Sequence, residues 1–292
     1  MKNVVVTGCP RADLGEVGAL ARFGVATVHE AIGRTGYLGP GIRPVHLGSR
    51  IGGTAVTVVC WPGDNLMIHA AVEQCCFGDV LVVTTASPST DGAFGELLAT
   101  ALHHRGVRGL VTTGGVRDVA ELHEMSFPVF CAAVSAQGTV KATPGAVNVP
   151  VSIAGQRVRP GDAVLADDDG VVVVPRSAVP GALAAAQARI DKERASRAAF
   201  RRGELGLDRY GLRSVLSDLG GQRVRAANPI DLHRVAAAHH RQQQRIPFRG
   251  IGGQVTGEKV QALGGTAAHQ HAPHAVAWHR RAAGPGHGPA SW

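Results

Sequence analysis

Residues 109–124 read GLVTTGGVRDVAELHE, and this stretch decides the fold class. The apolar, β-branched run 109–113 predicts a buried strand, and the run 119–124 predicts a short helix. Two glycines and the pair Arg117-Asp118 form the turn between them. A chain in which buried strands lead directly into helices is typical of α/β domains.

The flanking sequence continues this alternation. The expected strands are 52–60, 80–85 and 128–133, and the expected helices are 14–22, 27–36, 64–73, 93–104 and the long, Ala-rich 178–202. Thr27 and Glu30 have the spacing of a capping box at the start of the second helix. From 138 to 175 the pattern is β-rich, and the run DDDG at 167–170 fits a hairpin turn better than a metal-binding loop. The sequence therefore predicts one mixed α/β domain over residues 1–220.

The positive charge of the chain is concentrated after this domain. Residues 221–292 hold nine basic and two acidic residues, which is +7 of the formal net charge of +8. The segment is rich in Gly, His, Gln, Arg and Ala without a sustained apolar period, so we expect a basic disordered tail. A genuine tail and an extension translated out of frame both explain this composition. A nucleic-acid-binding arm is disfavoured, because aromatic residues do not alternate with the basic ones.

Composition and pattern disfavour a membrane protein, a secreted protein and a zinc-binding or disulfide-rich protein. The chain of 292 residues is 45% hydrophobic and 18% charged, which fits an ordinary folded core. No apolar run approaches the twenty or so residues of a membrane span, and the start lacks the pattern of a secretory leader, so we expect a cytoplasmic protein. The five cysteines include no C-x-x-C pair, which disfavours a zinc site or a disulfide framework.

The turn at Arg117-Asp118 is the first candidate site. Glycine at a strand-to-helix turn lets the backbone approach a ligand closely. An arginine there can bind a carboxylate through two parallel hydrogen bonds, and an aspartate can hold a hard divalent cation directly or through water. The alternative, in which Asp118 caps the following helix and Arg117 is solvated, is equally compatible with the spacing.

Two further segments carry candidate binding groups. Gly95-Glu96-Leu97-Leu98 opens a helix, and the unpaired N–H groups of a helix N-terminus bind anions. Asn65 and His69 lie four residues apart, so on a helix they share one face and can line a pocket. The alternatives are a common acidic helix start for Glu96, a capping Asp64-Asn65 pair, and a satisfied core histidine at 69.

Three stretches together resemble a known family. They are GDNLMIHAAVEQCCFGDVLVV from position 63, FGELLATALHHRGVRGLVTTGGVRDVAELHEMSFPVF from position 94 and GDAVLADDDGVVVVP from position 161. They resemble the 4-hydroxy-4-methyl-2-oxoglutarate / 4-carboxy-4-hydroxy-2-oxoadipate aldolases, which are metal-dependent pyruvate aldolases in the wider family of the regulator of ribonuclease E activity. The family signature is an acid, twenty residues and Arg-Asp, here Glu96 and Arg117-Asp118. Commoner members have Asp where this chain has Glu96.

The resemblance implies a fold and an assembly. The fold would be an α/β, mixed-sheet domain like the swivelling phosphohistidine domains, with a long C-terminal helix, assembled as a trimer or hexamer. Within it, Asp118 would bind Mg²⁺ or Mn²⁺, and Arg117 would contact the substrate. The backbone around Leu97 and Leu98 would hold the pyruvate carboxylate.

The resemblance also implies a reaction. Asn65 and His69 would line the pocket, Glu96 would hold a water that relays a proton, and Glu193 of a neighbouring subunit would complete the site. The chain would cleave a 2-oxo dicarboxylate or tricarboxylate to pyruvate and a second oxo acid, with oxaloacetate decarboxylation as a side activity. The alternative is a binding protein like the ribonuclease regulator, without enzymatic activity.

Overall fold

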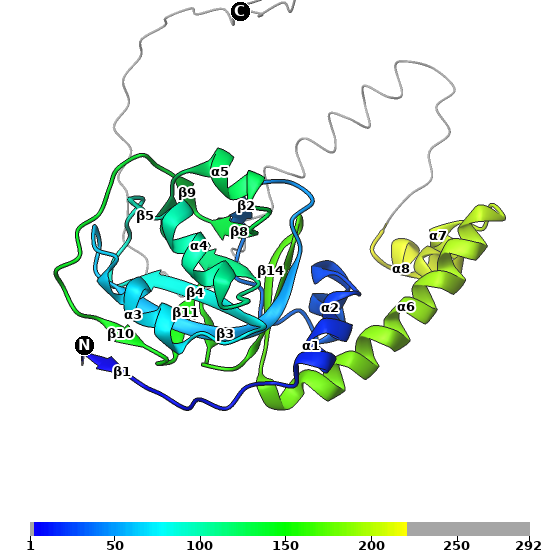
Figure 1. Cartoon of the computed structure of the whole chain (residues 1–292). Coiled ribbons are helices and arrows are strands. Elements are labelled where there is room, and N and C mark those ends of the chain that lie inside the picture. Colours follow the sequence, from blue (N-terminus) through cyan, green and yellow to red (C-terminus); the bar gives the residue numbers. More distant parts are fainter. Residues whose placement is uncertain (1–2, 221–292) are drawn as a thin grey trace, which may run out of the picture. The chain divides into compact units, whose positions relative to one another are not determined.

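The computed structural model describes residues 3–220, which lie within one compact unit (Figure 1). The predicted tail, 221–292, lies outside the described residues. Helices and strands alternate through the first half of the unit, and a β-rich segment and a long helix follow. The predicted mixed α/β fold is therefore confirmed.

A nine-stranded sheet forms the centre of the described residues. Its four middle strands, in the order β3, β4, β6 and β8, run parallel to one another. They span Ile51–Cys60, Asp79–Thr85, Gly109–Thr112 and Val129–Cys131. Strands buried on both faces read as continuous apolar runs rather than as alternating ones, which is why the sequence located them.

Short strands extend this sheet on both sides. Strand β10 lies antiparallel to β3 and β1 pairs with β10, while β2 borders β8. The hairpin of β13 and β14 pairs with the first half of β3, and its turn falls at Asp168 and Asp169, as predicted. These strands span Val4–Val5 (β1), Arg43–Pro44 (β2), Ala146–Val147 (β10), Ala163–Asp167 (β13) and Gly170–Val174 (β14), beside a separate pair, Val151–Ile153 (β11) and Gln156–Val158 (β12).

Alternate side chains of the parallel strands enter two different cores. On one face, Leu81 and Val83 pack with α3 (Leu66–Gln74), α4 (Glu96–His104) and α5 (Val119–Glu124). On the other face, Val80 and Val82 pack with the β-rich segment 146–173. Each fully buried valine or leucine contributes roughly 1.5–3 kcal/mol to the free energy of unfolding. The three crossover helices therefore share one face of the sheet (Figure 1).

A second, three-stranded sheet lies beyond the ends of the parallel strands. It consists of β5 (Gly92–Phe94), β7 (Gly115–Val116) and β9 (Ala133–Val134), which pair in parallel. Each follows one of β4, β6 and β8 along the chain. The predicted helix 93–104 consequently begins only at Glu96, because 92–94 belong to this sheet. The small sheet brings the segments that precede α4 and α5 together.

The second N-terminal helix differs from its prediction in bounds and in capping. Helix α1 covers Leu14–Ala21, and α2 covers Val25–Ala31 rather than 27–36. No capping box forms at Thr27: the helix begins after Gly24, which has φ at 84°, and the Asp167 carboxylate accepts the N–H of Val25 at 2.9 Å. The cap therefore comes from a turn that is 142 residues away in the sequence.

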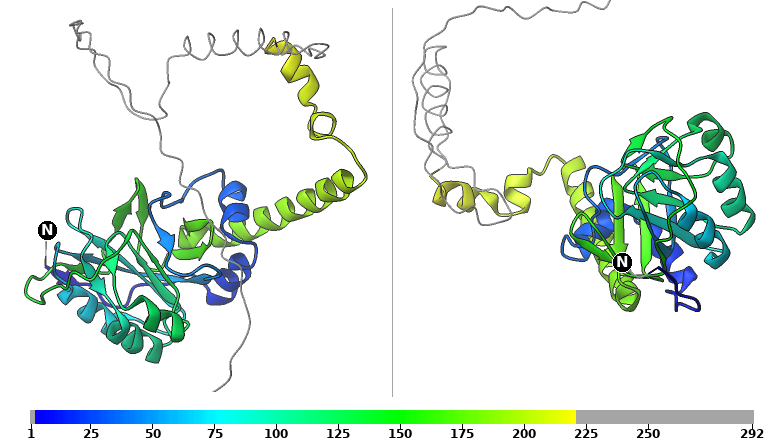
Figure 2. Two further views of the ribbon diagram at one scale, coloured as in Figure 1. Left: turned by 90° about the horizontal axis from the view of Figure 1, so that it is seen from above. Right: turned by 90° about the vertical axis from the view of Figure 1, so that its left-hand side faces the viewer.

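The predicted long helix is confirmed as α6, Val179–Arg201, preceded by the 3₁₀ turn η1, Arg176–Ala178. Its first half packs against α1 and α2 in a third core that includes Ala182 and Ala186. Its second half extends away from the sheet and leads to α7 (Gly206–Arg209) and α8 (Leu212–Asp218) (Figure 2). No helix among residues 3–220 has the length and apolarity needed to cross a membrane.

Candidate active site

All predicted site residues except Glu96 and Glu193 meet at a pocket of about 110 Å³ between the crossover helices and the small sheet. Four segments contribute: the start of α3, the β5–α4 junction, the β7–α5 junction and the loop before β10. The lining residues are Asn65, His69, Gly92, Ala93, Gly95, Leu97, Leu98, Arg117, Asp118 and Lys141. Groups that are far apart in the sequence are therefore brought together, as parallel strands that end at one edge of a sheet require.

Asp118 has an unusual backbone conformation. Its φ of 56° and ψ of 46° lie in the left-handed region, which few residues other than glycine adopt. Its Oδ2 accepts the N–H of Glu96 at 3.0 Å and lies 3.6 Å from Nε of Arg117. The alternative that Asp118 caps its own helix is wrong in one respect: the side chain makes no capping hydrogen bond to α5 and instead binds the first turn of α4.

Gly95 is required by this contact. A Cβ atom at Gly95 would lie 2.2 Å from Oδ2 of Asp118 and 3.1 Å from Cγ of Arg117. Gly95 is also the N-cap of α4, so the N–H groups of Leu97 and Leu98 have no helical carbonyl to bind. Leu97 is 78% exposed, while Leu98 is buried in the core and anchors the turn. The pocket thus contains a helix N-terminus that is open to an anion.

Asn65 and His69 both line the pocket, although Asn65 is the N-cap residue of α3 and not part of the helix. The Asn65 amide donates to the carbonyl of Ala93 at 2.9 Å, and its buried Oδ1 has no partner among the described residues. Burial, and then the charge of Lys141, lower the pKa of His69 below its ordinary value. His69 is therefore a neutral imidazole at pH 7, able to accept a proton.

Lys141 is a pocket residue that was not predicted from the sequence. It belongs to the β-rich region, where no role was expected for it, yet it lines the pocket. The buried Asp64 holds its loop, because its Oδ2 accepts the N–H groups of Ala142 and Thr143 at 2.8 and 2.7 Å. Burial opposes ionisation of Asp64, but these bonds and one from Leu66 lower its pKa. The available signal was that Lys141 is the only lysine between positions 3 and 191.

Two predicted carboxylates do not line the pocket in a single chain. Glu96 contributes its backbone N–H to Asp118, while its own Oε1 accepts the hydroxyl of Thr100 at 2.7 Å. Glu193 lies on α6, where it forms ion pairs with Arg189 and Arg197. The role of Glu96 as a water-holding group and the role of Glu193 in a neighbouring site stay predictions.

The donor atoms suit one kind of metal ion. Within residues 3–220, no three His, Cys, Asp or Glu side chains lie close enough together to hold a metal. A zinc site with three or four protein ligands is therefore not formed by these residues. A carboxylate at Asp118 and the unpaired amide oxygen of Asn65 fit a hard cation such as Mg²⁺, which keeps several of its water ligands.

The chain is similar to known proteins over the α/β domain. Residues 25–173 match the family model described as RraA-like: Aldolase/RraA. A Burkholderia multivorans protein named "Putative 4-hydroxy-4-methyl-2-oxoglutarate aldolase" is 36% identical over 49% of this chain and 87% of its own length. A Halalkalibacterium halodurans protein of the same name is 33% identical over 46% of this chain and 64% of its own length.

A solved structure is also similar. Streptomyces coelicolor RraAS2, described as an unusual member of the RNase ES inhibitor RraA protein family, is 32% identical to this chain. The match covers 64% of this chain and 98% of that structure, with a TM-score of 0.56. The chain is therefore similar both to proteins named as putative aldolases and to a member of a family named for RNase ES inhibition.

Proposed function

The chain belongs to the RraA-like, Aldolase/RraA family, and we propose that it is a metal-dependent lyase for a 4-hydroxy-2-oxo acid. Its substrate would be 4-hydroxy-4-methyl-2-oxoglutarate or 4-carboxy-4-hydroxy-2-oxoadipate, cleaved to pyruvate and a second oxo acid. The observation that carries the proposal is the pocket itself. It combines two cationic side chains, a helix N-terminus, a neutral histidine and an unpaired carboxamide oxygen around Asp118.

The charge distribution of the pocket matches an acid with several carboxylates. The N–H groups of Leu97 and Leu98 would bind the carboxylate next to the 2-oxo group, where the positive end of the α4 dipole favours negative charge. Arg117 and Lys141 would bind the oxygen atoms farther along the substrate, Arg117 with its planar fork and Lys141 as a mobile point charge. A substrate with only one carboxylate would leave one of these cations unpaired.

The chemistry follows from these positions. A base takes the proton of the C4 hydroxyl, the C3–C4 bond breaks, and its electron pair moves to the 2-oxo group to give the enolate of pyruvate. The enolate then takes up a proton at C3. A divalent cation held by Asp118 would act as a Lewis acid toward the negative charge on the 2-oxo oxygen. His69 can accept the hydroxyl proton because it is neutral, directly or through a water held by Glu96.

The same groups support a second reaction. Loss of CO₂ from oxaloacetate also yields the enolate of pyruvate, so oxaloacetate decarboxylation would be a side activity. It needs the oxo and carboxylate contacts at Leu97, Leu98 and Arg117 but no base for a hydroxyl proton. Substitution of His69 would consequently reduce retro-aldol cleavage more than decarboxylation.

The proposal extends to the assembly. Glu193 lies on the second half of α6 and lines a separate pocket together with Glu30 of α2 and Tyr210 at the end of α7. From there it cannot complete the site of its own chain. We propose a trimer or hexamer in which a neighbour brings Glu193 to the water around the cation. We also propose that the fold is a swivelling phosphohistidine-like domain.

A regulator-like binding protein is the competing function. It is favoured by the likeness to Streptomyces coelicolor RraAS2, whose length the chain matches almost completely. Such a protein needs the surface of the fold but no turnover. Measured catalysis therefore separates the two functions.

The decisive experiment measures pyruvate release from 4-hydroxy-4-methyl-2-oxoglutarate and from oxaloacetate. We expect turnover that chelation abolishes and Mg²⁺ or Mn²⁺ restores, and a loss of about 10²-fold or more in kcat for Asp118→Asn, which weakens the cation's anchoring carboxylate. Asp191→Asn, an exposed aspartate on α6, is the matched control and should keep wild-type rates. An Asp118→Asn variant with wild-type turnover after metal is restored would contradict the assignment.

A further inference from the structure

A second concave surface lies at the C-terminal end of α5, whereas the candidate active site lies at its N-terminal end. It consists of two adjoining pockets of about 250 and 430 Å³. The pockets share Arg50 and the segment 126–128, so they form one continuous groove. Its walls are the loop between β2 and β3, the C-terminal end of α4 and the C-terminal end of α5. We call it the basic groove.

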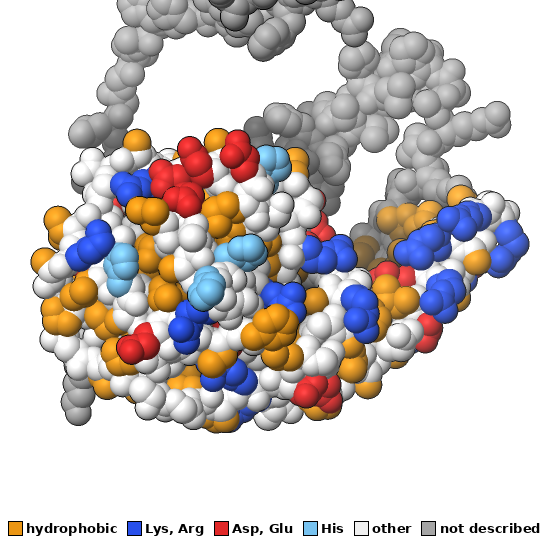
Figure 3. All heavy atoms as spheres, in the orientation of Figure 1, with side chains coloured by type: hydrophobic (Ala, Val, Ile, Leu, Met, Phe, Trp, Pro, Cys, Tyr) orange, Lys and Arg blue, Asp and Glu red, His pale blue; other side chains and the backbone are white. Residues whose placement is uncertain are grey.

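The groove carries positive or protonatable side chains and no acidic ones among its described lining residues. These side chains are Arg50, Arg108, His46, His103 and His123. Figure 3 shows histidine and basic side chains together over the C-terminal end of α4. At the rim, the carboxylate of Asp168 accepts the N–H of Gly48 at 2.8 Å. The lining of the groove therefore carries positive charge without an acidic side chain of its own.

Its two arginines have no anionic partner within residues 3–220. No hydrogen bond or ion pair holds the guanidinium of Arg50. The guanidinium of Arg108 lies 4.9 Å from the ring centroid of Phe77, which is 66% exposed. Stacking on a ring fixes the plane of a guanidinium while leaving its N–H edge free to bind an oxyanion in two-pronged fashion. Arg108 is thus held in place for such a contact.

The histidine pair connects this groove to the active-site segment. The Nε2 atom of His46 lies 2.9 Å from the carbonyl oxygen of Val119, so Nε2 must carry the proton and donate it. The ring of His123 lies 4.3 Å from that of His46, tilted by 41°. Val119 directly follows Asp118, so a ligand beside His46 would contact a side chain that is hydrogen-bonded to the segment carrying the proposed metal ligand.

We propose that the basic groove binds a small organic or inorganic polyanion with at least two negative charges, distinct from the substrate of the active-site pocket. Two arginines together with histidines match phosphoryl or clustered carboxylate oxygens, because a guanidinium binds both through paired N–H groups. The volume of the groove suits a molecule of metabolite size. Phosphoryl and carboxylate ligands would be recognised by the same contacts. Titration with one probe of each kind distinguishes between them.

The test is calorimetric titration of the full-length chain, stripped of metal, with pyrophosphate and separately with citrate. The decisive variant is Arg50→Gln with Arg108→Gln, and the matched control is Arg157→Gln, an exposed arginine on β12 outside the groove. A third variant, Arg117→Gln, reports any binding at the active-site pocket. Each variant removes positive charge without adding a negative one.

We expect saturable binding of at least one probe, weakened tenfold or more by the double substitution and less than twofold by Arg157→Gln or Arg117→Gln. Binding of pyrophosphate alone would identify a phosphoryl ligand, and binding of citrate alone would identify a carboxylate ligand. The proposal is overturned if neither probe binds, if Arg157→Gln weakens binding as much as the double substitution does, or if only Arg117→Gln abolishes it. These binding measurements do not depend on lyase activity, so they test the basic groove independently of the proposed function.

Discussion

At the scale of single residues, Asp118 combines backbone strain with a close packing contact. A left-handed conformation costs a non-glycine residue about 1–2 kcal/mol. It is maintained here because the side chain is held by the first turn of α4 and fits against the bare Cα of Gly95. Strain that the surrounding structure enforces is characteristic of functional positions. The pair Gly95 and Asp118 should therefore tolerate no added atom between them.

Substitution Gly95→Ala tests this packing. The new Cβ would meet Oδ2 of Asp118 at 2.2 Å, so the carboxylate must move and lose its bond to the N–H of Glu96. We expect kcat/KM for pyruvate release to fall by about tenfold or more, or about 1.4 kcal/mol of transition-state stabilisation. Gly18→Ala in α1 is the control: its Cβ meets nothing within 4 Å, so it should keep full activity and gain up to about 1 kcal/mol of stability. Equal activities in both variants would contradict the role of the contact.

Lys141→Gln tests the electrostatics of the pocket. The charge of Lys141 disfavours protonation of His69, so its removal should raise the pKa of His69 toward the ordinary value, with the larger effect of burial remaining. An NMR titration of the His69 ring would measure the change, and Lys192→Gln on exposed α6 should cause none. The depressed folded-state pKa also means that His69 reduces stability as the pH falls below about 6.5, the unfolded value. An unchanged or lower pKa in Lys141→Gln would place the lysine away from the ring.

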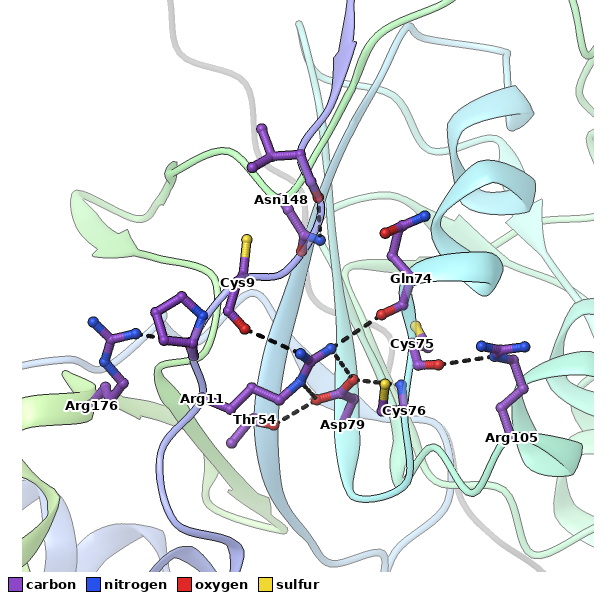
Figure 4. A network of polar contacts seen from close by, with 12 residues as sticks. Cys9, Arg11, Thr54, Gln74, Cys75, Cys76, Asp79, Arg105, Asn148 and Arg176 are labelled. Atoms are coloured by element: carbon purple, nitrogen blue, oxygen red, sulfur yellow. Dashed lines mark hydrogen bonds and ion pairs between the residues drawn. The ribbon is translucent and has the colours of Figure 1, made fainter.

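At the scale of elements, a buried ion pair fixes the N-terminal segment to the sheet. The Asp79 side chain, fully buried at the start of β4, binds Nε and Nη2 of Arg11 at 2.8 Å each. The hydroxyl of Thr54 and the N–H of Cys76 also donate to it, at 2.6 and 2.7 Å (Figure 4). The pair therefore joins the segment before α1, strands β3 and β4 and the turn after α3.

Removing one partner of this pair should be costly. Asp79→Ala would leave the Arg11 guanidinium without its counter-ion at the sheet, and we expect a loss of roughly 3–5 kcal/mol in the free energy of unfolding. Denaturant titration followed by circular dichroism measures it. Arg194→Ala, which breaks an exposed pair with Asp191 on α6, should change stability little. A small effect of Asp79→Ala would show that the N-terminal segment contributes little to the fold.

Elements with a strong period could be predicted from the sequence, and elements defined by tertiary contacts could not. The apolar runs of β3, β4 and β6 and the Ala-rich α6 have enough length for a pattern. The two-residue strands β7 and β9 have none, so the small sheet that places Gly95 beside Asp118 was not predicted. Lys141 was missed for a related reason: a loop held by Asp64 from another element leaves no local signal.

At the scale of the whole molecule, the residues that matter for the proposed function precede position 221. The active-site pocket, the basic groove and the three cores are all formed by residues within 3–220. Seven large apolar or aromatic side chains are exposed from the end of α6 to the end of α8. They are Phe200, Leu205, Tyr210, Leu212, Val215, Leu216 and Leu219. An apolar surface of this kind is expected at subunit contacts, so we place the proposed assembly contacts before Gly220 as well.

A chain that ends at Gly220 should therefore behave like the full-length chain. We expect the same trimer or hexamer by light scattering, the same thermal midpoint and the same kcat/KM, because no group assigned to catalysis or packing is removed. The deletion removes a charge of +7, so only binding to polyanionic surfaces such as heparin should weaken. A second truncation, before Leu205, serves as the contrast: it removes α7 and α8 and should dissociate the assembly and lower activity by separating Glu193 from the neighbouring site. If the Gly220 truncation itself dissociates or loses activity, residues 221–292 contain a contact that the composition of the segment does not reveal.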